Sequence, residues 1–337
     1  MDISQIKKRL TLWNLLFFGL GVLVLIFLLI QINFKDLLDL LIKIKVEYLL
    51  LGAVLYLCKG LIRAFRFKKI IRQNQSSFFK MLRLTFASSL ASQVLPLKLG
   101  ELTYVYLLKK DNRAPVSQGL SSLLVVRLLD LLAVSLIFIL VTLTVPITGT
   151  LVIYFRSILG FMALLLVAIL VLLFISGIDE KVIQFLNGFS IVRKFSILGK
   201  IVNWLSSFLL ELKQYRWHQY LGWTGLACAE WLVNFAVFHA LMLGFGFTPS
   251  YLDTVTAVTF SVLASVLPIN SMGNFGTQEV GWTAGLTLLG YTKEAAISSG
   301  FATHLITLGY FLVYGGLSWI SYLFNPGDAR RDKQETV

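Results

Sequence analysis

The chain has 337 residues, 57% hydrophobic and only 14% charged, and its mean hydropathy of +0.80 excludes an ordinary soluble domain. Apolar stretches of eighteen or more residues are typical of membrane-spanning helices, so the sequence predicts an all-α polytopic membrane protein. The formal charge of +13 comes from Lys and Arg in short loops, a pattern that fits membrane orientation and leaves no polar region large enough for a nucleic-acid module.

Six apolar stretches are expected to cross the membrane once each. In chain order they are 11–32, 47–66, 119–145, 152–176, 219–245 and 295–323. The first is too long for a cleaved signal peptide, so we expect an uncleaved span. Cys58 and Cys228 lie in different stretches, and we expect small buried residues rather than a disulfide or a metal pair.

Two further stretches, 80–110 and 251–290, are interrupted by proline and glycine near their middles. Their limbs have about 12 to 18 residues, and at 1.5 Å per residue most are shorter than the ~30 Å hydrocarbon core. We therefore expect two re-entrant helical hairpins, each entering and leaving by the same face, with the turn covered by protein or water. The predicted breaks are Pro96, Gly100, Pro268, Gly273 and Gly276.

Two segments have apolar residues spaced for one helical face, 34–45 and much of 179–215. Each is expected either to lie in the membrane interface or to be a connector that happens to be amphipathic. The second is also basic, which suits anionic lipids. With the N-terminus in the cytoplasm, most loop Lys and Arg residues lie on that side, so the charge bias predicts that both termini are cytoplasmic.

The sequence LASQVLPLKLGE at 90–101 returns in related form as LASVLPINSMGNFGTQE at 263–279. An odd number of crossings separates the two, so the second half is expected to be inverted relative to the first, as in many secondary transporters. The predicted organisation is a first span with an interfacial segment at 1–46, repeat halves at 47–176 and 219–323, a cytoplasmic connector at 177–218 and a tail at 324–337.

Ionisable residues follow the same repeat. Glu101 comes directly after the first break and Arg127 lies in the next span; Glu279 and His304 have the corresponding places in the second half. Charged groups at depth are costly unless they pair or line a cavity, so they are functional candidates. Asp130 lies three residues after Arg127 and is its natural partner. The alternatives are a purely structural Arg127–Asp130 pair, helix-start stabilisation by the two glutamates, and a satisfied core histidine.

Other candidate residues lie near the breaks and at the membrane edge. Gln93 and Asn270 lie beside the breaks, where free backbone N–H groups of the following limbs attract phosphate. Arg63 and Arg66 are expected where phospholipid headgroups lie, with a purely topological role as the alternative. Glu230 lies within a span, and the sequence names no partner for it beyond Asn234, one turn away.

Four motifs carry a resemblance to a known family: RAFRF at 63–67, VLPLKLGEL at 94–102, VVRLLDLL at 125–132 and LPINSMGNFGTQE at 267–279. With them, most of 47–323 resembles the membrane domain of lysylphosphatidylglycerol synthases and its stand-alone, flippase-like relatives in bacteria and archaea. The resemblance implies movement of lipids or lipid-linked sugars between leaflets of a prokaryotic cytoplasmic membrane. The residues matching recurrent family positions are Glu101, Arg127, Asp130, Pro268, Gly276 and Glu279.

The chain departs from the family pattern in three places. Val126 stands where the family commonly has a glutamate, and His304 where it commonly has an arginine, so the substrate is open. The sequence stops at Val337 with no soluble aminoacyl-transferring domain, so lysine transfer to a lipid is not expected.

The primary hypothesis is therefore a lipid transporter without covalent chemistry or cofactor, whose partners are a phosphate-bearing lipid substrate and anionic membrane lipids. Protonation changes at Glu101, Glu279 and His304 would couple transport to a proton gradient. The alternatives are a membrane-embedded enzyme acting on a lipid phosphate and a small-solute or ion channel. A homo-oligomer is an alternative to a monomer.

Overall fold

The computed structural model describes residues 34–71, 77–95, 100–112, 114–144, 152–174, 215–266 and 275–324, with isolated helical positions at 30, 184, 188, 202 and 212. Every regular element within these ranges is a helix, which confirms the all-α prediction. The helices are α2 (Phe34–Lys43), α3 (Val46–Ile70), α4 (Phe78–Val94), α5 (Gly100–Asn112), α6 (Val116–Thr144), α7 (Val152–Phe174), α11 (Trp217–Gly244), α12 (Tyr251–Val266), α13 (Thr277–Leu288) and α14 (Lys293–Phe324).

Four described helices, α3, α6, α11 and α14, are long and apolar enough to cross a membrane. They coincide with four of the six predicted spans. The predicted span 152–176 corresponds to α7, which has 23 residues and a shorter apolar segment at Arg156–Val171. The first predicted span lies outside the described residues except for position 30, and the basic segment 179–215 lies almost wholly outside them.

The chain divides into two compact units. The described parts of 1–116 and 230–337 form the first, and those of 117–229 form the second. These boundaries follow packing and do not coincide with the predicted repeat halves, which stay a prediction. In the second unit, the Ser135 hydroxyl of α6 donates to the Met162 sulfur of α7 over 3.4 Å. Cys58 and Cys228 are half-buried free thiols.

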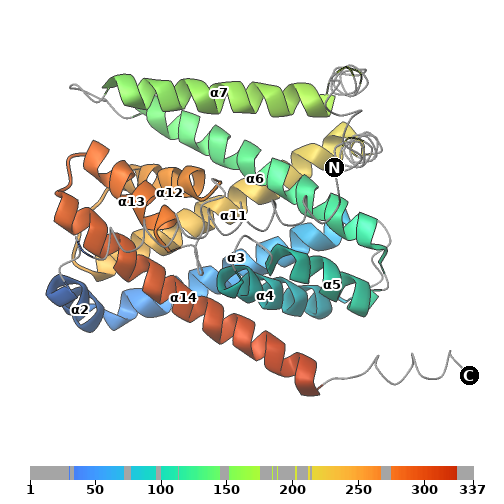
Figure 1. The fold of residues 1–337 in the computed structure, drawn as a ribbon, viewed down its shortest axis with the longest axis horizontal. Helices are drawn as coiled ribbons and strands as arrows, with labels where there is room; N and C mark the ends of the chain where they lie inside the picture. Colours follow the sequence, from blue (N-terminus) through green and yellow to red (C-terminus); the bar gives the residue numbers. More distant parts are fainter. Residues whose placement is uncertain are drawn as a thin grey trace, which may run out of the picture. The chain divides into compact units, whose positions relative to one another are not determined.

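In the first unit, α14 packs against α4, α13, α2 and α3 (Figure 1). The Tyr310 and Tyr314 hydroxyls of α14 donate to the carbonyls of Leu49 and Ala53 in α3, over 2.7 and 3.0 Å. Both partners advance by four residues, so α14 and α3 run in the same direction.

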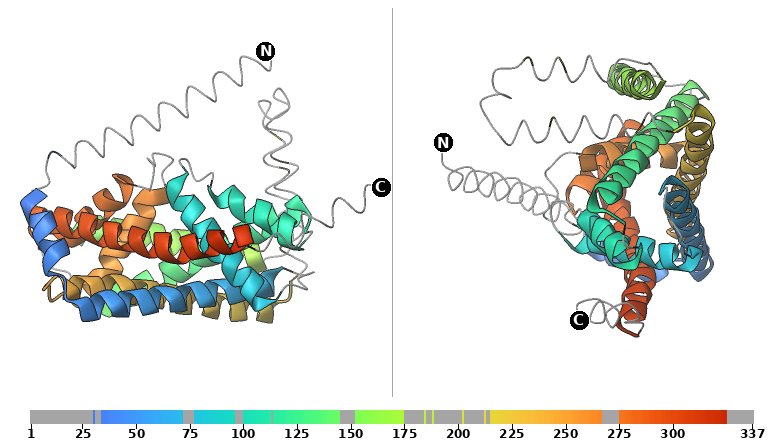
Figure 2. Two further views of the ribbon diagram at one scale, coloured as in Figure 1. Left: turned by 90° about the horizontal axis from the view of Figure 1, so that it is seen from below. Right: turned by 90° about the vertical axis from the view of Figure 1, so that its right-hand side faces the viewer.

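Helix α3 runs antiparallel to residues 230–244 of α11 (Figure 2). The Lys45 N–H, just before α3, donates to the Gly244 carbonyl at the end of α11 over 3.1 Å. Further along α3, the Lys59 ammonium donates to the Asn234 side-chain oxygen over 2.9 Å. The beginning of one helix thus meets the end of the other.

Two adjacent helix pairs, α4–α5 and α12–α13, pack as hairpins. Glycine permits the close approach in both: a Cβ at Gly100 would lie 2.1 Å from the Ala91 carbonyl oxygen, and one at Gly281 would lie 2.4 Å from that of Phe260. With 17, 13, 16 and 12 residues, the limbs are about 18–26 Å long, below the ~30 Å of a hydrocarbon core. Their re-entrant insertion into a membrane stays a prediction.

The open end of each hairpin is held by a polar contact. In the first, the Arg83 guanidinium lies 3.2 Å from the Asp111 carboxylate, which also accepts a 2.7 Å hydrogen bond from Tyr322 of α14. In the second, the Tyr291 hydroxyl donates to Asp253 over 3.3 Å. One carboxylate therefore ties the two limbs together in each hairpin.

Helix α2 covers the beginning of α14. Leu37 is buried there against Ile297, Phe301 and Ala302, while Ile42 of the opposite face is exposed. The amphipathic pattern of 34–45 therefore predicts a helix correctly. Leu37 packs on the protein while Phe34 and Leu38 are exposed like Ile42, so the placement of this helix in the membrane interface stays a prediction.

Candidate functional site

Glu279 lies in the first turn of α13, at a helix start built on Gly276. Gly276 has φ 92°, a left-handed conformation that favours glycine, and its N–H donates to Glu279 Oε2 over 2.7 Å. This is one arm of a capping box, because a glutamate three residues into the helix satisfies an otherwise free N–H group. The helix-start role considered for Glu279 is thus confirmed, although its 0% exposure goes beyond what capping requires.

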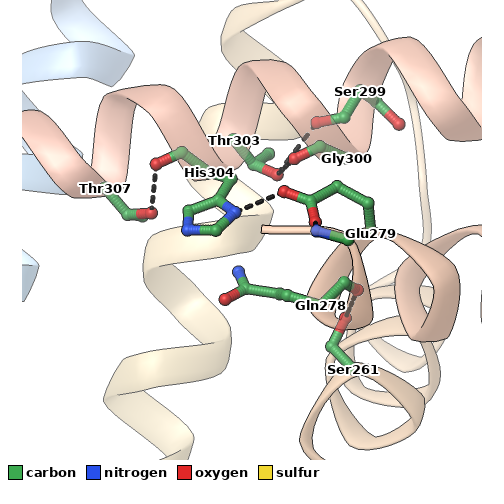
Figure 3. A network of polar contacts seen from close by, with 9 residues as sticks. Ser261, Gln278, Glu279, Ser299, Gly300, Thr303, His304 and Thr307 are labelled. Atoms are coloured by element: carbon green, nitrogen blue, oxygen red, sulfur yellow. Dashed lines mark hydrogen bonds and ion pairs between the residues drawn. The ribbon is translucent and has the colours of Figure 1, made fainter. Parts of the chain in front are cut away.

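The other oxygen of the same carboxylate contacts a histidine. His304 Nδ1, on α14, contacts Glu279 Oε1 (Figure 3), and the imidazole side chain is only 3% exposed. The ring of Phe275 stacks on the imidazole with 4.2 Å between centroids. The structure therefore brings together the two ionisable residues that the sequence predicted for the second half.

The Glu279–His304 pair can hold a proton between two atoms. Along the line from Nδ1 to Oε1 one proton suffices for a hydrogen bond, whether the pair is formally neutral or a carboxylate–imidazolium ion pair. Because Oε2 is bound to the Gly276 N–H, the contact lies where α13 meets α14.

A second buried cluster joins α3 to α11. Glu230 lies 3.2 Å from Arg63 Nε through Oε1 and 3.1 Å from Arg66 Nη2 through Oε2. Arg66 is fully buried and the Arg63 side chain is 22% exposed. The cluster supplies the partners of Glu230 that the sequence did not name. The expected position of both arginines at the membrane edge stays a prediction.

Lys59 extends the same cluster by one turn. Its ammonium donates to Asn234 and lies 5.0 Å from the centre of the Tyr56 ring and 5.9 Å from that of Phe311, within cation–π range. We call Lys59, Arg63, Arg66, Glu230 and Asn234 the α3–α11 polar stripe. The spacing 59, 63, 66 on α3 and 230, 234 on α11 places each set on one helix face, a signal that indicates a polar face on each helix but not that the two faces meet.

The first-half candidates lie in two different units and are described separately. Arg127 Nη1 lies 4.0 Å from Asp130 Oδ2, as the spacing predicted, but the Arg127 side chain is 45% exposed. Glu101 lies half-buried in the first turn of α5, and Gln93 is half-buried near the end of α4. Glu101 belongs to the first unit and Arg127 to the second, so their equivalence to Glu279 and His304 stays a prediction.

Of the five predicted breaks, Gly100 begins α5 and Gly276 precedes α13. Pro96, Pro268 and Gly273 lie outside the described residues, as does Asn270. Across the part of the chain that the structure describes, no three His, Cys, Asp or Glu side chains gather closely enough to hold a metal ion.

Comparison with known proteins identifies a family of membrane domains. A family model described as "Lysylphosphatidylglycerol synthase TM region" matches residues 13–316. No curated protein and no solved structure matches the chain. The matched range contains both hairpins, the α3–α11 polar stripe and the Glu279–His304 pair.

Proposed function

Because the chain belongs to the family of the lysylphosphatidylglycerol synthase transmembrane region, we propose that it moves a phosphate-bearing lipid between the two membrane leaflets. The family and the apolar helices establish a lipid-related membrane protein. In the proposed function, the protein moves the lipid between leaflets and leaves its covalent structure unchanged. The protein would act in the cytoplasmic membrane with both termini on the cytoplasmic side, as its loop charges predict.

The buried Glu279–His304 pair is the observation that carries this proposal. An ionisable pair at the contact between a hairpin limb and a long apolar helix is costly in a membrane protein and is typical of proton relays in transporters. Apolar side chains of similar size often stabilise a protein as well as a buried ion pair does, so stability alone does not require this pair. In the proposed mechanism the pair gains and loses a proton as the lipid moves, which would couple transport to a proton gradient.

The α3–α11 polar stripe supplies the groups that would hold a lipid phosphate. From Lys59 to Arg66 the stripe follows α3 for about 10 Å, at a rise of 1.5 Å per residue. Arg63 and Lys59 are partly exposed, and guanidinium and ammonium groups are the usual protein partners of phosphate. A headgroup could therefore contact successive cations while its tails stay in the bilayer.

The antiparallel arrangement of α3 and α11 also supports the proposal. These helices correspond in the predicted repeat, and an inverted repeat requires that they run in opposite directions. Each is followed by a hairpin closed on a glycine and held by a carboxylate. Inverted repeats with broken helices around a central site are common in secondary transporters.

The test uses proteoliposomes containing NBD-labelled phosphatidylglycerol, with dithionite reporting on the outer leaflet. Glu279→Gln keeps an oxygen for the Gly276 N–H but replaces the carboxyl group with an amide that cannot take up or release a proton in the transport cycle, so we expect at least a tenfold lower rate of lipid movement. Glu294→Gln, an exposed glutamate in the first turn of α14, is the matched control and should retain the wild-type rate.

Full activity of Glu279→Gln, and of the double variant that adds Glu101→Gln, would remove both glutamates from the mechanism. The same liposomes discriminate the alternatives. A change in lipid mass would identify an enzyme, and conductance in a planar bilayer would identify a channel.

A further inference from the structure

The basic end of α3 has two faces with different surroundings. Arg63 and Arg66 lie towards Glu230 of α11. Phe65, Lys68 and Lys69 lie elsewhere on the helix: Phe65 and Lys69 are exposed, and Lys68 is partly so. Among the described residues, the ion pairs with Glu230 involve the first face, and the second face is separate from them.

The second face lines a pocket of about 540 Å³ together with the beginning of α4. Its described lining consists of Phe65, Lys68, Lys69 and Phe78. Ser77 fixes the start of α4 by accepting a hydrogen bond from the Lys80 N–H over 3.3 Å, which makes Phe78 the first helical residue. We call this cavity the α3–α4 pocket.

The pocket surface is mainly apolar, and two of its four described lining residues, Lys68 and Lys69, carry ammonium groups. The Lys69 ammonium lies 5.3 Å from the centre of the Phe65 ring, so its charge is held beside the apolar wall. Next to the pocket, Phe79 is 78% exposed and contacts the Phe78 ring edge-to-face at 6.1 Å. Aromatic and basic side chains at the end of a spanning helix are typical of the membrane interface, where lipid headgroups meet acyl chains.

We propose that the α3–α4 pocket binds one anionic phospholipid as a resident lipid, separate from the transported one. The volume falls within the range of small-molecule sites and suits a glycerophosphate group with the first part of an acyl chain. The two lysines favour a negative headgroup, since a choline or ethanolamine cation would be repelled. The pocket lies on a different face of α3 from the polar stripe, so both can be occupied at once.

The binding test uses the full chain in detergent and native mass spectrometry with dioctanoyl phosphatidylglycerol. Dioctanoyl phosphatidylcholine is the neutral comparison. Phosphatidylglycerol should bind with an apparent Kd at least tenfold lower than that of phosphatidylcholine. Lys68→Gln with Lys69→Gln should remove this preference, while Lys109→Gln with Lys110→Gln, an exposed pair at the end of α5, should preserve it.

Two results would overturn the proposal: equal binding of the two lipids to the wild-type chain, or an unchanged preference in the Lys68–Lys69 variant. Phe78→Ala should weaken both lipids, because it removes an apolar wall. Complete displacement of the lipid by inorganic phosphate at equal concentration would show that the site recognises phosphate alone.

Transport distinguishes a resident lipid from a substrate. The Lys68–Lys69 variant should still move labelled lipid in proteoliposomes at no less than half the wild-type rate. Joint loss of lipid binding and transport in this variant would place the two lysines in the transport route instead. Because this readout does not depend on Glu279, failure of the resident-lipid proposal and failure of the proposed function can be told apart.

Discussion

Replacing Glu230 with glutamine should destabilise the protein strongly, because one carboxylate neutralises two arginines. The substitution keeps the size of the side chain and an oxygen acceptor, so it removes little besides the charge. Arg66, with no exposed surface, would be left as a buried cation without this partner, whereas Arg63 is partly exposed and can reach polar surroundings.

The magnitude follows from the distances of 3.1 and 3.2 Å. Two unit charges about 4 Å apart attract each other by about 4 kcal/mol at an effective dielectric constant of about 20. Loss of one partner from a buried ion pair typically costs about 3–5 kcal/mol, because the remaining charge stays desolvated. We therefore expect Glu230→Gln to lower the free energy of unfolding by about 3–5 kcal/mol.

Denaturation in mixed detergent micelles, followed by tryptophan fluorescence, measures this loss. Glu47→Gln, at the exposed start of α3, is the control and should change stability by less than about 0.5 kcal/mol. Adding Arg66→Met to Glu230→Gln should recover most of the loss, because the pair is then replaced by groups without charge. Equal stability of Glu230→Gln and Glu47→Gln, or no recovery in the double variant, would refute the reasoning.

Two further predictions concern the second hairpin. Gly281→Ala places a Cβ 2.4 Å from the Phe260 carbonyl oxygen and should lower the free energy of unfolding by about 1–3 kcal/mol in the same denaturation assay. Gly309→Ala is the control and should leave it unchanged, because a Cβ at Gly309 has no atom within 4 Å. Burial and the Asp253 carboxylate raise the pKa of Tyr291 to about 12 from its ordinary value of 10.0. Because the pKa of Tyr291 is higher in the folded protein, its contribution to the free energy of unfolding is present below pH 10 and is lost as the pH rises to about 12. Tyr291→Phe should therefore remove this part of the alkaline destabilisation. It should also remove the corresponding phenolate absorbance step at 295 nm.

The sequence predicts the helices well because each span is encoded locally. The long apolar stretches give α3, α6, α11 and α14, and the proline–glycine interruptions separate the limbs of the hairpins. Glu279 and His304 could also be predicted, since a glutamate after a glycine-rich break begins a helix and an ionisable residue inside the next span needs a partner.

The α3–α11 polar stripe could not be predicted in the same way. Lys59 and Asn234 are 175 residues apart, and no local pattern says which apolar helices become neighbours. The rule that basic residues mark the cytoplasmic side also treats all charges in RAFRFKK alike. Only the packed structure shows that Arg66 is an interior residue and Lys69 a surface one.

Helix α14 packs against α4 of one hairpin and α13 of the other. A shift or tilt of α14 would therefore change its packing against both hairpins at once. This one helix gives the two hairpins of the first unit a common packing partner.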